Sequence, residues 1–76
     1  MIRAFTPQQR RNVRHLSRTL GGRAHLSTML DTHRAALGSL DNLIEKGADT
    51  PQVVADRKAV LANIATIERF LGTVRA

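Results

Sequence analysis

The apolar residues of this chain recur at alternating spacings of four and three along two stretches on either side of a short turn. The first stretch carries Leu26, Leu30, His33, Leu37, Leu40 and Ile44. The second carries Val53, Val60, Ile64, Ile67, Leu71 and Val74, with Arg57 at one position of the series. This heptad spacing is typical of helices that pack lengthwise on one another. It predicts an all-α fold with an antiparallel hairpin of two helices, at about 23–46 and about 51–75.

Two similar signals mark where helices begin. Thr6-Pro7 and Thr50-Pro51 each offer an N-cap hydroxyl followed by proline at the first helical position. Gln9 also supplies the residue that closes a capping box with Thr6. The second signal follows residues 47–50, which we expect to form the turn of the hairpin. The first signal predicts a shorter basic N-terminal helix at about 7–20.

A short apolar stripe belongs to this first helix and consists of Val13, Leu16 and Leu20. The next large apolar residue, Leu26, lies one residue before the position that this spacing would predict. The pair Gly21-Gly22 lies between the two stretches. Each glycine weakens a helix by about 1 kcal/mol relative to alanine. We therefore expect a break or a sharp kink at these glycines. The alternative is that the first helix is continuous with the second, as one bent helix from Pro7 to Lys46.

The length of 76 residues fits a single helical domain, residues 1–76, with a small core. The chain has no cysteine, so disulfides cannot supplement that core. A well-packed hairpin or association with another chain then has to provide the stability. The residues that we expect to be buried are Leu26, Leu30, Leu37, Leu40, Ile44, Val53, Val60, Ile64, Ile67 and Leu71.

The net charge of +6 is concentrated at the start of the chain, since residues 1–30 contain six arginines and no acid. Four of these arginines belong to the first helix or its end: Arg10, Arg11, Arg14 and Arg18. Arginine is suited to bidentate contacts with carboxylates and phosphates. We take these four residues as the candidate site for an anion or an acidic partner; the alternative is an ordinary solvated helix face.

The side of the second helix opposite its apolar seam carries small, uncharged residues: Ala24, Thr28, Ala35, Gly38, Ser39 and Asn42. Small residues allow another backbone to approach closely. Either the first helix folds back onto this face, or a second chain packs there, or the face is a surface of low charge. The candidate interface residues are Ala35, Gly38 and Asn42, together with Phe70 of the third helix.

No catalytic, cofactor-binding or metal-binding residues are predicted. His15, His25 and His33 are not spaced as ligands on one helix face, and we expect His33 to lie at the edge of the core. No apolar run is long enough to span a membrane. We expect a cytoplasmic protein, although the arginine-rich start shares the composition of a mitochondrial transit peptide.

These features predict a small non-enzymatic protein-binding module, such as a subunit, adaptor or inhibitor, that docks a helical surface onto a partner protein. We expect a homodimer or a subunit of a larger assembly. Small chains without catalytic residues are frequent among phage and mobile-element proteins. The alternative is a nucleic-acid-binding protein or ribonucleoprotein component that uses the arginine-rich helix. Membrane-surface binding is less favoured, because the apolar side of that helix is short and lacks tryptophan.

Overall fold

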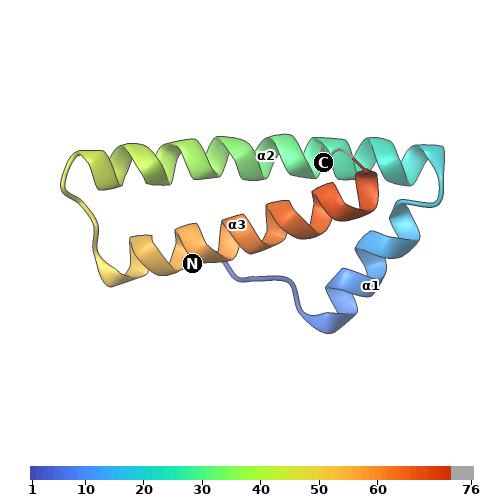
Figure 1. The fold of residues 1–76 in the computed structure, drawn as a ribbon, viewed down its shortest axis with the longest axis horizontal. Helices are drawn as coiled ribbons and strands as arrows, with labels where there is room; N and C mark the ends of the chain where they lie inside the picture. Colours follow the sequence, from blue (N-terminus) through green and yellow to red (C-terminus); the bar gives the residue numbers. More distant parts are fainter. Residues whose placement is uncertain (73–76) are drawn as a thin grey trace.

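The computed structural model describes residues 1–72, which form three helices and no strand. The helices are α1 (Pro7–Leu16), α2 (Leu20–Glu45) and α3 (Pro51–Leu71). Figure 1 shows α2 and α3 alongside each other in opposite directions, with α1 packed near the start of α2 and the end of α3. The predicted all-α architecture, with the second and third helices packed together, is confirmed.

Threonine caps start the helices at the two predicted positions. Thr6 Oγ1 accepts a hydrogen bond from the Gln9 backbone N–H at 3.1 Å, and the Gln9 side chain closes the capping box. Thr50 Oγ1 accepts from the backbone N–H of Val53 at 3.3 Å. Gly47 adopts a left-handed φ of 84° just after α2, as a helix terminator does.

Gly72 explains why the third helix is shorter than predicted. It adopts a left-handed φ of 70° and caps α3 at Leu71, whereas the heptad spacing had predicted a helix to about residue 75. A left-handed glycine ends a helix at little steric cost. Val74, the last predicted seam residue, lies outside the described residues.

The break between the first two helices lies at residues 17–19, so its predicted position at Gly21-Gly22 is wrong. The bent-helix alternative is also wrong, because α1 and α2 are separate helices. Thr19 caps α2 by accepting a hydrogen bond from the Gly22 N–H at 2.9 Å. Leu20 is consequently the first residue of α2 and is 90% exposed, not part of an apolar stripe on α1.

Gly22 permits a close contact instead of breaking a helix. It is buried, and a Cβ at this position would lie only 2.1 Å from the backbone oxygen of Leu16. Only glycine therefore allows the first turn of α2 to pack against the end of α1. A Cβ at the neighbouring Gly21 would meet nothing within 4 Å.

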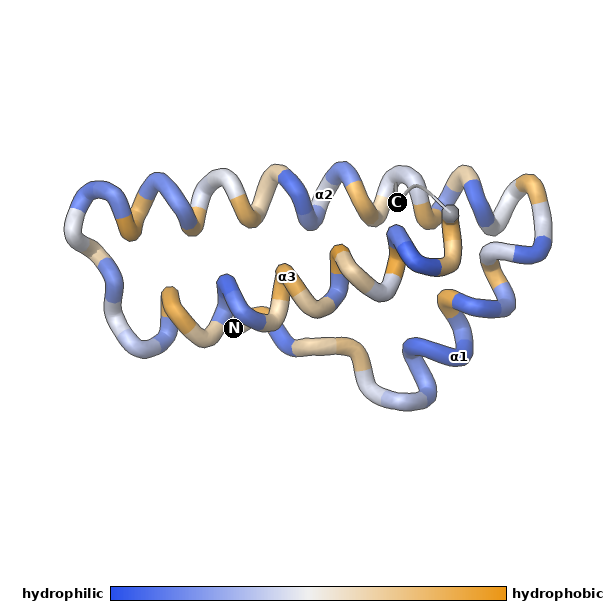
Figure 2. The backbone as a smooth tube through the Cα atoms, in the orientation of Figure 1, coloured by the Kyte–Doolittle hydropathy of each residue, from blue (hydrophilic) through white to orange (hydrophobic). Residues whose placement is uncertain are grey.

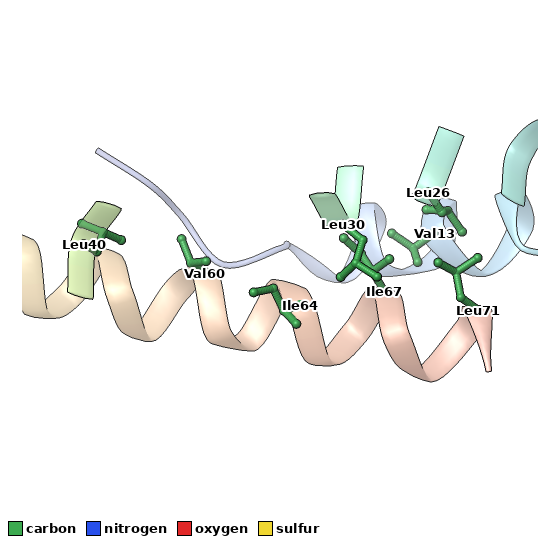
Figure 3. Packing of buried hydrophobic residues seen from close by; sticks show 8 residues of the cluster. All are labelled: Val13, Leu26, Leu30, Leu40, Val60, Ile64, Ile67 and Leu71. Carbon is green, nitrogen blue, oxygen red and sulfur yellow. The ribbon is translucent and has the colours of Figure 1, made fainter. Parts of the chain in front are cut away.

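The core lies mainly where all three helices meet. Figure 3 shows its buried members: Val13, Leu26, Leu30, Leu40, Val60, Ile64, Ile67 and Leu71. Three residues of the predicted buried set are only half-buried: Leu37, Ile44 and Val53. Ile44 and Val53 flank the turn, where the ribbons of α2 and α3 diverge in Figure 1.

Residues 1–6 form an extended segment that packs on the hairpin. Ile2 and Phe5 contact the core, and the backbone N–H of Ile2 donates to Asp56 Oδ1 at 3.1 Å. Asn63, which is 2% exposed, accepts from the Phe5 N–H at 2.7 Å and donates from Nδ2 to the Arg3 carbonyl at 3.0 Å. One buried amide thus holds this segment through both of its polar atoms.

His33 lies half-buried beside this amide, at the edge of the core where the sequence had placed it. Its Nδ1 lies 2.8 Å from the Met29 carbonyl, which can only accept, so Nδ1 carries the proton. Nε2 lies 3.4 Å from Asn63 Nδ2. The Phe5 ring meets the imidazole edge to face, with centroids 5.7 Å apart.

Candidate functional site

A groove of about 350 Å³ lies between α1 and the C-terminal half of α3. Four of the residues that line it are arginines. The complete lining consists of Pro7, Arg10, Arg11, Arg14, Thr66, Arg69 and Phe70. It thus joins three of the predicted anion-binding residues to an arginine from the other end of the chain.

The spacing of the arginines and one buried side chain explain why the arginines of α1 line the groove. Arg10 and Arg11 lie three and four residues after Pro7, and Arg14 lies four and three residues after them, so all four share one helix face. Val13, the one buried residue of α1, fixes the opposite side of the helix in the core. Figure 2 shows α1 as mostly hydrophilic, in contrast to the alternating pattern along α2 and α3.

Two of the guanidinium groups are held by neutral acceptors. Arg10 Nη1 donates to the Phe5 carbonyl at 2.9 Å, and Arg11 Nη2 donates to Gln8 Oε1 at 2.8 Å. The guanidinium of Arg69 lies over the ring of Phe70, 5.7 Å from its centroid. Each guanidinium has five N–H donors, so these contacts leave most donors available to a ligand.

No acid lines this groove, and its arginines form no salt bridge within residues 1–72. The salt bridges of this part of the chain are Arg34–Glu68 at 2.8 Å and Arg57–Asp41 at 2.6 Å. Four like charges that share a groove without a counter-ion repel one another, and a bound anion relieves that repulsion. The groove therefore has the electrostatics of an anion-binding site.

One predicted site residue lies elsewhere than expected. Arg18 follows Ser17, the C-cap of α1, and does not line the groove, although its spacing had placed it in one row with Arg14. Phe70 is half-buried and lines the groove beside Arg69. No local signal in the sequence points to Arg69, because its place in the groove depends on how α1 docks against α3.

The small-residue face of α2 is not covered by α1. Ala35, Gly38 and Asn42 are exposed, and a Cβ on Gly38 would meet nothing within 4 Å. The alternative in which the first helix folds onto this face is therefore wrong. Packing of a second chain there stays a prediction.

Residues 1–72 contain no group of three or more histidine and acidic side chains placed to hold a metal ion. His15 and His25 are exposed and stand apart from the groove lining. None of the helices in this part of the chain is long and apolar enough to cross a membrane. Comparisons of the chain with protein-family models, with curated proteins and with solved structures find no match.

Proposed function

We propose that this chain is a non-enzymatic protein-binding module whose basic groove receives an acidic segment of a partner protein. The proposal rests on one observation: Arg10, Arg11, Arg14 and Arg69 line a single groove that no acid shares. Planar guanidinium groups bind carboxylates through paired hydrogen bonds, which gives orientation as well as attraction. The module would act by occupying its partner's surface, as a subunit, adaptor or inhibitor does.

The size of the groove favours a short peptide segment. The ten residues of α1 span about 15 Å at 1.5 Å per residue, the length of a few extended residues. Phe70 and Pro7 add apolar surface beside the charges. An acidic segment that also carries an apolar side chain would match this lining better than a uniformly charged polymer.

The positive charge also affects the rate of association. Residues 1–30 carry all of the chain's excess charge, and electrostatic attraction raises the rate at which oppositely charged partners meet. We expect this attraction to weaken with salt, because exposed charges more than about 8–10 Å apart are screened at physiological ionic strength.

A labelled glutamate-rich peptide with one central leucine provides the direct test, by fluorescence anisotropy. The variant Arg10→Glu/Arg14→Glu reverses two groove charges and should weaken binding by about tenfold or more, as loss of charge-assisted contacts does. The matched control is Arg3→Glu/Arg18→Glu, which changes the net charge equally at exposed positions outside the groove lining. We expect the control to lose only about twofold to threefold. Equal losses in both variants would show that the groove has no specific role.

Nucleic-acid binding is a second candidate, favoured by the six arginines and absent acids of residues 1–30. Phosphate contacts from four groove arginines would give a log–log salt slope of about −3 for a single strand. Base stacking would add little, because Phe5 packs against the core and Phe70 already faces Arg69. Titration of a mixed-sequence single-stranded DNA in increasing salt measures the slope, and no binding at about 50 mM salt would eliminate this candidate.

A further inference from the structure

A second groove, of about 630 Å³, lies between the C-terminal half of α2 and the N-terminal half of α3. No residue of the N-terminal segment or α1 lines it, so the hairpin carries an uncovered groove at its turn end. The lining consists of Asp41, Ile44, Glu45, Val54, Arg57, Lys58 and Leu61.

Apolar side chains form part of this lining. Val54 is 51% exposed and Leu61 is 39% exposed, while Ile44 is half-buried between the helices. A soluble helix normally presents long polar side chains at such positions. Their exposure leaves apolar surface that contact with another chain would remove from water.

The charged residues of the groove are segregated by helix. The acids Asp41 and Glu45 come from α2, and the bases Arg57 and Lys58 come from α3. Asp41 and Arg57 form an ion pair across the hairpin at 2.6 Å. Glu45 and Lys58 are both exposed. One side of the groove is therefore acidic and the other side basic.

This charge pattern is complementary to itself. When two copies face each other across this groove, a two-fold axis parallel to the helix axes places α2 of one copy over α3 of the other. Each acidic side then meets a basic side. A two-fold axis perpendicular to the helix axes would instead place α2 over α2 and α3 over α3, so that acidic residues face acidic residues and basic residues face basic residues. The distribution of charge thus favours one dimer geometry over the other.

We propose that a second copy of this chain docks in this groove about the parallel two-fold axis, forming a bundle of two α2 and two α3 helices. The side of each copy that carries Asp41 and Glu45 then lies over the side of the other copy that carries Arg57 and Lys58, and Val54 and Leu61 of both copies become buried. Four-helix bundles of this kind pack nearly antiparallel helices over a shared apolar core. The proposal does not depend on the basic groove.

The small-residue face of α2 is compatible with this dimer. Gly38 lies three residues before Asp41 and seven before Glu45, so it shares their side of the helix. A Cβ at Gly38 would meet nothing within 4 Å, which leaves open space beside the groove. A second copy could therefore approach α2 closely at this position.

Charge-reversal variants test the proposal by sedimentation equilibrium from micromolar to millimolar protein. The unmodified chain should form dimers. Glu45→Lys or Lys58→Glu alone puts a like charge on the acidic–basic contact at both sides of the interface and should weaken dimerisation by about tenfold or more. An equimolar mixture of the two variants should restore dimers, because in the heterodimer both facing pairs again have opposite charge.

Exposed charges outside the groove supply the matched controls. Asp31→Lys and Arg18→Glu make comparable charge changes at exposed positions and should leave association unchanged. Circular dichroism melts of the dilute variants check that each still folds; Leu61→Glu provides a further variant that should remain monomeric. A chain that stays monomeric at millimolar concentration, or a mixture that associates no better than either variant alone, would overturn the proposal.

Discussion

The two ends of the α2–α3 hairpin follow the same heptad spacing but differ in how well they are buried. At the end that α1 joins, which we call the three-helix end, Leu26 and Ile67 are fully buried. At the turn end, Ile44 and Val53 hold equivalent seam positions yet are only half-buried. The difference arises because α1 packs against the first end, whereas the N-terminal segment reaches α3 at Asp56 without lining the groove at the turn.

This contrast shows that a heptad seam determines which side chains point inward but not whether water is excluded from them. Two helices in contact cover only part of each other's apolar face, and a third element is needed to cover the rest. In this chain a single α1 side chain, Val13, joins the buried cluster at the three-helix end. The uncovered turn end is where we propose that a second copy packs.

The largest expected change in stability comes from replacing an isoleucine of the seam, and its size should differ between the two ends. Ile67→Ala should lower the free energy of unfolding by about 4 kcal/mol, since it removes a fully buried side chain and leaves a cavity. Ile44→Ala should cost about 1–2 kcal/mol, because water already reaches that position and can fill the space. Urea unfolding of dilute protein measures both. Equal losses would contradict the contrast between the ends.

Loss of the Asn63 amide should be the next largest effect. Asn63→Ala removes the acceptor for the Phe5 N–H and the donor to the Arg3 carbonyl, so we expect a loss of about 2–3 kcal/mol. Chemical shifts of residues 1–6 should change with it, because the segment loses both of these hydrogen bonds. Asn42→Ala, at an exposed position on α2, is the control and should change stability by less than about 0.5 kcal/mol.

The glycine pair offers a comparison within the three-helix end. Gly22→Ala should cost about 2 kcal/mol or more, because its Cβ would overlap the backbone oxygen of Leu16. Gly21→Ala should stabilise the chain by about 0.5–1 kcal/mol, since alanine is the better helix former and space is open there. Thermal melts of the two variants, followed by circular dichroism, should therefore shift in opposite directions. Shifts of the same sign would contradict the proposed packing of α2 on α1.

The smallest expected effect concerns the ion pair at the turn end. Both Asp41 and Arg57 are substantially exposed, so Asp41→Asn should cost at most about 0.5 kcal/mol in dilute protein despite the 2.6 Å contact. The loss should shrink further in high salt. Urea titrations at two salt concentrations measure it, and a loss above about 1.5 kcal/mol would mean that the turn end depends on charge rather than on its apolar seam.

The helices could be predicted from the sequence where the capping signals agreed with the heptad spacing of the apolar residues. The Thr-Pro pairs correctly placed the starts of α1 and α3, and the seam spacing correctly paired α2 with α3. The break near Gly22 was misplaced because a glycine pair has two uses that the sequence does not distinguish: ending a helix or admitting a close neighbour. The contact with Leu16 is a tertiary one and has no local signal.

The basic groove between α1 and α3 could also be predicted only in part, because its lining depends on a tertiary contact. Arg10, Arg11 and Arg14 share a helix face by spacing alone. Arg69 joins them only through the docking of α1, which Val13 and the Asn63 hydrogen bonds stabilise. Nothing in the spacing of asparagine indicates that one buried amide will hold the N-terminal segment.

Hydrogen exchange along α2 in dilute protein most directly tests whether α1 completes the core at one end of the hairpin only. Backbone amides in a well-packed core exchange only through large-scale unfolding. Amides in helix segments with few buried contacts exchange through local opening. We expect the slowest exchange around Leu26 and Leu30, with protection falling towards Ile44. Uniform protection along α2, or greater protection near the turn, would show that the turn end is packed as well as the three-helix end.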